Sequence, residues 1–390
     1  MILLSLALAF QAPGDSITLD QAVERARQAR GTLAAASAGV AEARSAFRAA
    51  GSIPNPTVSY SHSESTPRNH LLVDQPLDWL LKRGGDRSAA RAGVDRALAD
   101  SALVAYGLTR EVRVAFYRAR AATLAETLVR AQAGLGDSVA RIAAARLRAG
   151  DIALLEEEQA GQEAARARQT AAAARETARS DQAELARAIG WEGAPPTPAG
   201  RLDAGLDLLP DSAIDLTALP AVRSATADSA AAAALARSAA RARVPLPTLQ
   251  SGAEWGDESQ PGALAVVGVS VPFPLWNLGG GTAGVARARA ARAAAQVREA
   301  RLDAQRQVRL ARIHLEETAA RARFARDTIL PGAAVLRDRA VRAYRAGETG
   351  ILPVLDALRG ERDASLAALQ DQLAFQEALA DWYALTEREQ

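Results

Sequence analysis

Histidine is the side chain of this sequence best suited to bind a transition metal, and the chain contains three histidines. His62, His70 and His314 are scattered along the sequence rather than clustered. Protein metal sites need several ligands that converge on one ion. The sequence therefore predicts ordinary surface or rim residues at these positions and no metal site.

Three consecutive carboxylates, Glu156, Glu157 and Glu158, are a second candidate for cation binding. Successive side chains on a helix point in different directions, so three in a row do not converge on one ion. We expect this run to form a solvated or lumen-facing acidic patch.

No enzyme site is recognisable in the sequence. The glycine run Gly279–Gly281 is followed by neither of the glycine-rich patterns that cradle phosphates. The chain has no cysteine, which excludes disulfides, thiolate metal sites, a cysteine nucleophile and a lipid-modified N-terminal cysteine. No nucleophile, base and acid form a set. We predict that the protein is not an enzyme and has no cofactor.

One short phrase occurs twice, about half a chain apart. Residues 147–160 are LRAGDIALLEEEQA, and residues 344–357 are YRAGETGILPVLDA. Gly150 and Gly347 hold the same place in each phrase, and glycine tolerates the left-handed conformation that ends many helices. Apolar residues recur every three or four positions before each phrase, which is typical of a helix with one buried face. We predict that the phrases are the tips of two long helical hairpins.

The stretch before the first phrase is unusually long for a helix. Residues 86–149 contain no proline, and a helix of this length spans on the order of 100 Å. No ordinary globular domain is that long. In the second hairpin, Pro331 is predicted to produce a kink.

The composition favours long helices packed side by side. Hydrophobic residues reach 49% of the chain but aromatic residues only 4%, and alanine and arginine crowd the long segments. The net charge is +2, and the charges alternate along the helices rather than forming blocks. Nucleic acid is therefore not an expected partner.

The first residues predict export from the cytoplasm. Residues 1–12 are apolar, and Ala7-Leu8-Ala9 resembles a cleavage site, which predicts a secretory signal peptide. The usual basic residues before the apolar part are missing, so the natural start is expected upstream. No other uncharged apolar run reaches the length of about 18 residues that a transmembrane helix needs.

The two halves of the chain share more than the phrase. Pro54-Asn55-Pro56-Thr57 recurs as Pro245-Leu246-Pro247-Thr248, and residues 110–113 (REVR) recur as residues 306–309 (RQVR). This preserved order indicates an internal duplication. We predict three regions after the signal peptide: a first repeat at 13–190, a connector at 191–216 and a second repeat at 217–390.

Each repeat is predicted to contain a first helix, two strands and a long helical hairpin. The first helices are expected at about 19–50 and 217–243, with Thr18 and Thr217 as N-caps. The strand-like runs cover about residues 57–64, 71–79, 249–255 and 265–273.

Apolar and polar residues alternate within these runs, and this pattern indicates whether the strands could span a membrane. Leu71, Leu77 and Trp79 are expected on one face of the second run, with Asp74 and Asp78 on the other. Segments of about ten residues that alternate in this way are typical of transmembrane β-barrel strands. The alternative is a pair of soluble hairpins packed on the helices.

Four strands are too few to close a barrel in a membrane. Single-chain barrels begin at about eight strands, and an open edge in lipid leaves backbone groups without hydrogen bonds. If these strands span a membrane, several copies of the chain must therefore pool them.

Together these features resemble the TolC-like outer-membrane efflux family, and in particular its cobalt–zinc–cadmium efflux branch. The most specific motif is residues 271–277 (VPFPLWN), followed by Gly279–Gly281 and an alanine-rich helix. The first half carries the related residues 75–77 (QPL) and 82–84 (KRG). The resemblance implies a mainly α fold with a small β part. In that family, long α-helical hairpins form a trimeric α-barrel tunnel, capped by a transmembrane β-barrel with four strands from each protomer.

The resemblance also implies a function. The implied function is that of an outer-membrane exit duct of a tripartite efflux pump, which passively conducts heavy-metal cations or drugs from the periplasm to the exterior. The implied partners are two further copies of the chain in a homotrimer, a periplasmic adaptor, an inner-membrane pump and outer-membrane lipid. The helical tunnel is expected in the periplasm. A periplasmic coiled-coil adaptor or structural protein remains the alternative.

The family's functional positions can be carried over residue by residue. The periplasmic gate is expected at Tyr344, Thr349 and Asp356, where Thr349 replaces an arginine that locks the gate in the best-known member. Three copies of Asp356 are therefore expected to lack a matching cation, and Tyr344 is expected to brace a neighbouring helix by packing and a hydroxyl hydrogen bond. The tips expected to contact the adaptor comprise Arg148, Gly150, Asp151, Arg345, Gly347 and Glu348. The strand–helix junctions are expected at Pro76, Gly84, Pro272 and Gly280.

Overall fold

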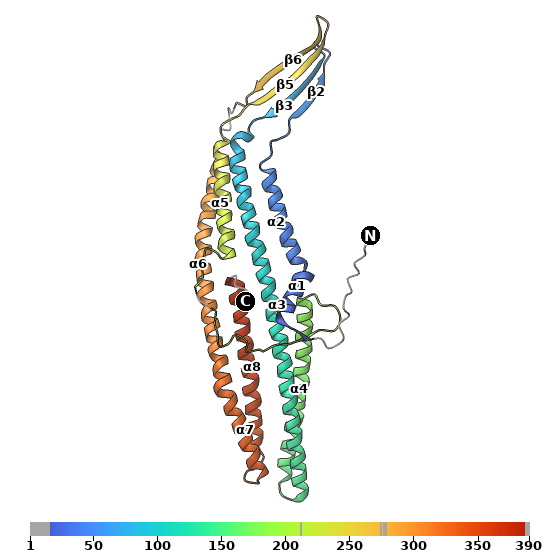
Figure 1. Ribbon diagram of the computed structural model, residues 1–390, viewed down its shortest axis with the longest axis vertical. Helices are drawn as coiled ribbons and strands as arrows, with labels where there is room; N and C mark the ends of the chain where they lie inside the picture. Colours follow the sequence, from blue (N-terminus) through green and yellow to red (C-terminus); the bar gives the residue numbers. More distant parts are fainter. Residues whose placement is uncertain (1–15, 211–212, 274, 276–278, 387–390) are drawn as a thin grey trace, which may run out of the picture. The chain divides into compact units, whose positions relative to one another are not determined.

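The computed structural model describes residues 16–210, 213–273, 275 and 279–386, and it divides into two compact units (Figure 1). Unit 1 comprises Met1–Gly31, Ala105–Ile214 and Arg306–Gln390, and unit 2 comprises Thr32–Val104 and Asp215–Gln305. Each unit therefore draws on both halves of the sequence. The predicted signal peptide, residues 1–12, lies outside the described residues, as do Pro274, Trp276 and Asn277 of the junction motif.

Unit 2 is built from a sheet and the helices that lead into it and out of it. Its strands are β2 (Thr57–His62), β3 (Asn69–Pro76), β5 (Thr248–Asp257) and β6 (Gln260–Ser270). Its helices are α2 (Gly31–Ala49), α5 (Pro220–Arg241) and the first parts of α3 (Trp79–Ala149) and α6 (Gly280–Phe324). The strands form one antiparallel sheet in the order β2-β3-β5-β6, so one hairpin from each half of the sequence meets at the β3–β5 pair.

The four predicted strands are confirmed, with corrections at their ends. The fourth, predicted over about residues 265–273, begins at Gln260 and ends at Ser270, so Val271 and Phe273 lie outside it. The second also ends earlier than predicted. β3 ends at Pro76, and Trp79 is the first residue of α3 rather than a strand residue. The Leu77 N–H donates to the Pro247 carbonyl, and the Leu80 N–H already donates back to the Leu77 carbonyl. The backbone therefore leaves the sheet at Leu77 and turns at once into the helix.

Unit 1 consists of helices with a long connector laid across them. Its elements are α1 (Leu19–Ala29), the second parts of α3 and α6, α4 (Leu154–Ala188), α7 (Leu330–Arg345) and α8 (Leu352–Thr386). A short parallel pair joins β1 (Ser16–Ile17) to β4 (Thr197–Pro198). Among the described helices of the chain, none is long and apolar enough to cross a bilayer.

The connector is held to unit 1 through its backbone carbonyls. The buried Gln376 side chain of α8 donates to the carbonyls of Leu202 and Ala204, both at 2.8 Å. Leu206 is buried in one core with residues of α6 and α8, which include Leu315, Phe375 and Trp382. These contacts fix the connector although it lacks long regular structure, because its polar backbone groups find side-chain partners.

The two predicted N-caps have different outcomes. Thr18 caps α1 in a capping box, in which its hydroxyl accepts from the Gln21 N–H and the Gln21 side chain accepts from the Thr18 N–H. Thr217 does not cap α5, which begins at Pro220. Proline supplies a fixed backbone angle for the first helical position, while the Thr217 hydroxyl donates to Asp215 at 2.7 Å.

Near Pro331, where the sequence predicts a kink, the helix changes type. A π-helical turn, η1 (Ala325–Ile329), stands directly before α7, and Pro331 follows it in the first turn of α7. Proline lacks an N–H and its ring crowds the carbonyl four residues earlier, and a wider turn relieves both problems. Arg326 in this turn forms a two-pronged hydrogen bond with Asp207 of the connector at 2.9 Å.

Candidate functional site

Both repeated phrases form the same helix-ending turn. Gly150 and Gly347 each have φ of +80°, as the helix-ending role predicted. In the first turn the Asp151 N–H donates to the Arg146 carbonyl at 2.9 Å, and in the second the Glu348 N–H donates to the Ala343 carbonyl at 3.0 Å. This is the Schellman arrangement, in which a left-handed residue lets the chain satisfy the last carbonyls of a helix.

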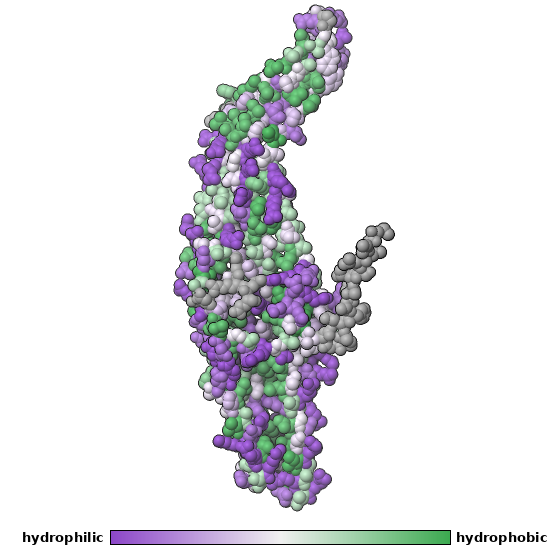
Figure 2. Space-filling view, viewed as in Figure 1, coloured by the Kyte–Doolittle hydropathy of each residue, from purple (hydrophilic) through white to green (hydrophobic). Residues whose placement is uncertain are grey.

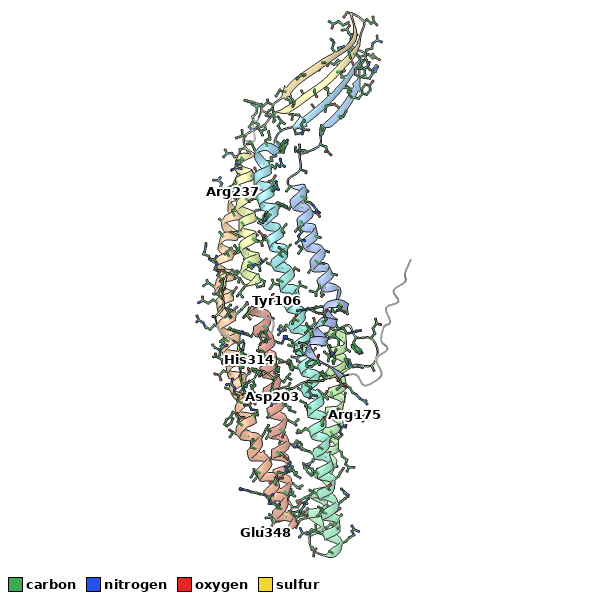
Figure 3. All side chains as sticks on the ribbon, in the orientation of Figure 1. Tyr106, Arg175, Asp203, Arg237, His314 and Glu348 are labelled. Carbon is green, nitrogen blue, oxygen red and sulfur yellow. The ribbon has the colours of Figure 1, made fainter. Side chains whose placement is uncertain are left out.

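The predicted tip residues are all on the surface. Arg148, Asp151, Arg345 and Glu348 are exposed, as is Thr349. Figure 3 shows Glu348 at the turn between α7 and α8. Leucines beside the turns are also exposed: Leu154 at 59%, Leu155 at 62% and Leu352 at 55%. Each tip thus presents charged and apolar side chains together.

Behind the tips, the two hairpins share a core. The buried residues of this core are Val139, Ala143, Ala160, Tyr344, Ile351, Val354 and Leu355. Tyr344 is 2% exposed, and the Arg146 guanidinium of α3 lies 5.0 Å from the centre of its ring. The expected packing of Tyr344 against the other hairpin is therefore present. The expected hydroxyl hydrogen bond is not, because the buried Tyr344 hydroxyl has no partner within the described part of the chain.

Asp356, the third predicted gate residue, has a cation beside it. Its side chain is 74% exposed, and Arg359 Nη1 lies 3.3 Å from its carboxylate. The expectation that Asp356 lacks a matching cation is therefore wrong. The Arg359 partner comes from one helical turn later in α8, where residues three apart are neighbours.

Arg359 also binds a buried carboxylate of the other hairpin. Its Nη2 donates to Glu163 Oε2 of α4 at 2.6 Å, and Arg362 Nη1 lies 3.8 Å from the other oxygen. Glu163 is 7% exposed. The hydrogen bond from Arg359 lowers the pKa of Glu163 below its usual range, and burial opposes this effect only in part. Glu163 is therefore charged at neutral pH and holds the two arginines of α8 against α4.

The strand–helix junction of unit 2 surrounds a cavity of about 360 Å³. Pro272 and Gly279 line this cavity, which we call the junction cavity. Pro76 stands at the end of β3, opposite Thr248 of β5. The predicted junction residue Gly280 is the first residue of α6, and Gly279 before it has φ of +69°. The backbone turn thus requires glycine at Gly279.

Near this junction α3 and α5 approach each other closely at Gly85, one residue after the predicted junction residue Gly84. A Cβ on Gly85 would lie only 2.6 Å from Ser238 Cβ of α5. A Cβ on Gly84 would meet only Arg241 Nη1, at 3.9 Å. Ser238 also donates to Asp86 at 2.8 Å, so α3 and α5 are joined at this point by packing and by a hydrogen bond.

The sheet has one apolar face and one mixed, more polar face. The register places Val58, Tyr60, Leu71, Leu249, Val267 and Val269 on the apolar face, and all are exposed. Figure 2 shows hydrophobic side chains over much of the sheet and hydrophilic ones at the strand tips. Tyr60 stacks on Trp255 near those tips, with ring centres 6.2 Å apart. The mixed face carries a His70–Glu254 pair at 3.0 Å.

The structure also places the other two histidines, at which the sequence predicts no metal site. His62 Nδ1 lies 2.9 Å from Asn69 Oδ1 across the β2–β3 pair. His314 is in α6, and its carbonyl accepts from the Thr318 hydroxyl. In the portion of the chain that the structure describes, no three metal-binding side chains come together.

Comparison with known proteins shows which fold the chain shares. CzcC, a cobalt-zinc-cadmium resistance protein of Cupriavidus metallidurans, is 27% identical over 355 residues, which are 88% of this chain and 83% of that protein. A crystal structure of CusC matches with a TM-score of 0.79 at 18% identity, over 97% of this chain and 95% of the other. The open-state MtrE outer membrane channel of Neisseria gonorrhoeae matches with a TM-score of 0.77 at 20% identity, over 94% and 88%. No family model matches the chain.

This chain has the TolC-like fold. The resemblance of its sequence to the TolC-like outer-membrane efflux family is confirmed, as is the mainly α class with a small sheet.

Two residues of this TolC-like chain form a contact that its sequence does not predict. Glu163 is the buried carboxylate between the hairpins, and Arg359 is the arginine that binds it. A signal for Glu163 was present, because it shares a face of α4 with the small residue Ala160, one turn earlier. An acidic residue on an alanine face that packs against another helix requires a partner. Nothing in the sequence names that partner, which lies 196 residues away.

Proposed function

We propose that the protein is the outer-membrane exit duct of a tripartite efflux pump, formed by three copies of the chain. Its place is the outer membrane, with the helices in the periplasm. We infer that substrates pass through it passively, along the tunnel that three copies of the chain would enclose. The protein is not proposed to act as an enzyme.

The observation that carries this proposal is the sheet of unit 2. Its order β2-β3-β5-β6 leaves an edge on β2 and another on β6, and its exposed face is apolar. An apolar face suits lipid, but open edges do not, because their N–H and C=O groups lack partners there. Pairing of β6 in one copy with β2 in the next removes every edge once the ring closes. Three copies give a barrel within the size range of known outer-membrane barrels.

Heavy-metal cations are the substrate class that we favour, with drugs as the other class. The support is the resemblance to CzcC, whose name refers to cobalt, zinc and cadmium resistance. A periplasmic adaptor and an inner-membrane pump are the proposed partners. The hairpin tips, with Gly150 and Gly347 at their turns, are the proposed adaptor surface, because they present exposed charges beside exposed leucines.

The periplasmic gate is proposed at the α7–α8 tip. Asp356 and Thr349 are exposed there, while Tyr344 anchors the tip in the shared core. In a trimer, three exposed carboxylates facing one axis favour cations, as acidic rings do in cation pores. Arg359 holds α8 to α4, so closure combines packing with an ion pair.

One set of measurements tests the proposal. The protein is expected in the outer-membrane fraction, to require detergent for extraction, and to have the mass of a trimer in mild detergent. In planar bilayers it is expected to form channels. Extraction by salt alone, or a monomer without channels, would instead support a periplasmic adaptor or structural protein.

A further inference from the structure

We propose that the junction cavity of unit 2 binds the phosphate headgroup of an anionic glycerophospholipid. This inference rests on the proposed function, since it requires the sheet to be embedded in the outer membrane. The cavity has a mixed lining, which includes the cations Lys82 and Arg243, the carboxylate Asp78 and the apolar side chains of Leu81, Val244, Leu246 and Phe273. A charged headgroup attached to apolar chains needs such a mixed surface.

Positive charge gathers at this end of the sheet. The segments that join the sheet to the helices are residues 46–56, 77–87, 241–247 and 271–283. They contain six basic residues, Arg48, Lys82, Arg83, Arg87, Arg241 and Arg243, and two acidic residues, Asp78 and Asp86. The turns at the opposite end, residues 63–68 and 257–260, contain three acidic residues and one arginine. The two ends of the sheet thus differ in sign.

The cations near the junction come from the start of α3, the end of α5 and the segment that follows α5. Lys82 Nζ lies 2.7 Å from Asp78, and the Arg83 guanidinium lies 5.5 Å from the centre of the Trp79 ring, both within the first turns of α3. Arg241 at the end of α5 places Nη1 beside Gly84 of α3. Arg243 follows in the cavity lining. Arg83 is half-buried, whereas Arg241 and Arg243 are exposed.

Exposed apolar side chains lie beside these cations. Their exposed fractions are 55% for Leu80, 59% for Val244, 57% for Val271, 80% for Phe273 and 63% for Leu275. A tryptophan with basic and large apolar neighbours is the usual composition of a membrane–water interface. Apolar surface of this kind suits the upper part of the acyl chains, while basic side chains suit the phosphate.

The leaflet of the outer membrane that contacts the junction determines which lipid is expected there. The helices of the chain leave the sheet at this end, and they are proposed to enter the periplasm. The junction then faces the inner leaflet of the outer membrane, which consists of glycerophospholipids. Lipid A carries phosphate as well but occupies the outer leaflet, which corresponds to the acidic end of the sheet.

Native mass spectrometry of the purified full chain tests this site. The protein is titrated separately with phosphatidylglycerol, phosphatidylcholine and lipid A. We expect the wild type to bind phosphatidylglycerol most tightly, and to bind it less tightly at higher salt. The variant Lys82→Gln/Arg83→Gln/Arg241→Gln/Arg243→Gln is expected to lose at least about 25-fold in affinity for phosphatidylglycerol, since each basic residue near an anionic membrane contributes about fivefold and two of the four line the cavity.

Matched variants distinguish a specific lipid site from a general effect of positive charge. Arg175→Gln/Arg179→Gln changes two exposed arginines of α4 in unit 1, of which Figure 3 labels Arg175, and is expected to bind as the wild type does. Replacing Arg83, Arg241 and Arg243 with lysine is expected to retain most of the binding, because the charge is kept. If the four-residue variant does not fold, the lipid preference and salt dependence of the wild type still decide the matter.

Three results would overturn the inference: equal wild-type affinity for phosphatidylglycerol and phosphatidylcholine, tighter binding of lipid A, or equal losses in the junction and α4 variants. Channel formation and outer-membrane fractionation are measured on the same wild-type protein. If the lipid site is absent, channel formation and outer-membrane fractionation are still observed. If the proposed function is wrong, neither is observed.

Discussion

Arg359 of α8 donates to Glu163 of α4 across a 2.6 Å hydrogen bond, and so joins the second helical hairpin to the first. The same guanidinium lies 3.3 Å from Asp356, the exposed carboxylate proposed for the gate. A change at the gate and a change in the contact between hairpins are therefore coupled through one side chain.

Replacement of Glu163 by glutamine is expected to loosen the contact between hairpins. The variant keeps the shape of the side chain but loses the charge that binds Arg359. Hydrogen bonds to charged groups contribute about 1.5–3 kcal/mol, and the partial exposure of Arg359 places the expected loss in the free energy of unfolding at the lower end. Urea unfolding measures the loss, and single-channel recording is expected to show a higher open probability.

Glu158→Gln is the matched control for this variant, because it removes the same charge from an exposed position of the same helix.

Acid should also weaken the wild-type contact between Glu163 and Arg359. The pKa of Glu163 is lowered from its usual 4.5, so its contribution to stability is complete above 4.5 and is lost as the pH falls through the lower native value. Equal effects of the two variants, or loss of the contact between pH 8 and 5, would contradict this role.

Replacement of Asp356 by asparagine is expected to weaken cation selectivity and block by multivalent cations. In the proposed trimer three of these carboxylates face one axis, and their removal lowers the local concentration of cations. Reversal potentials in asymmetric salt measure the selectivity. Asp363, which is also exposed on α8 and pairs with Arg362, supplies the control Asp363→Asn. Unchanged selectivity and block in Asp356→Asn would remove this residue from the gate.

Two substitutions at Tyr344 are expected to act in different ways. Tyr344→Ala removes a fully packed ring, and losses of this kind lower the free energy of unfolding by about 3–5 kcal/mol. It should also raise open probability. Tyr344→Phe removes a buried hydroxyl that has no partner among the described residues, so it should be neutral or stabilise by up to about 1 kcal/mol. A large loss in Tyr344→Phe would show that the hydroxyl is bound after all.

The hairpin turns are expected to tolerate only glycine. Valine at both Gly150 and Gly347 must adopt φ of +80°, which costs an L-residue about 1–2 kcal/mol at each turn although no atom lies in the way. We expect the double variant to insert in membranes but to lose efflux, measured as sensitivity to zinc, cobalt, cadmium and several drugs. Gly350 lies in the same loop and is not among the glycines with positive φ, so Gly350→Ala is the control. Wild-type resistance in the double variant would refute the docking role of the tips.

Adjacent glycines of α3 are expected to respond in opposite directions to alanine. Gly85→Ala forces a methyl group to within 2.6 Å of Ser238 and is expected to destabilise by about 1–3 kcal/mol. Gly84→Ala meets no close atom and should stabilise the helix by about 0.5–1 kcal/mol. Thermal unfolding of the two variants side by side measures this difference. Similar midpoints for both would mean that α3 and α5 separate easily at this point.

The sequence by itself determined the features that depend on local patterns. Alternating residues predicted the four strands, and the glycine in each repeated phrase predicted the turn with positive φ at Gly150 and Gly347. The N-cap at Thr18 was predictable for the same reason, and Pro331 marked the place where the helix changes type. Each of these features depends on residues only a few positions apart, so the local sequence is enough to predict it.

The tertiary structure alone decided which distant residues meet. Whether Gly84 or Gly85 carries the close helix contact depends on the rotation of α3 against α5, and one residue along a helix turns its side chain by about 100°. Glu163 and Arg359 stand 196 positions apart, and each also resembles many other charged residues of an amphipathic helix. Only the packing of α4 against α8 selects them, because many helix registers satisfy the same apolar pattern and one of them buries this pair.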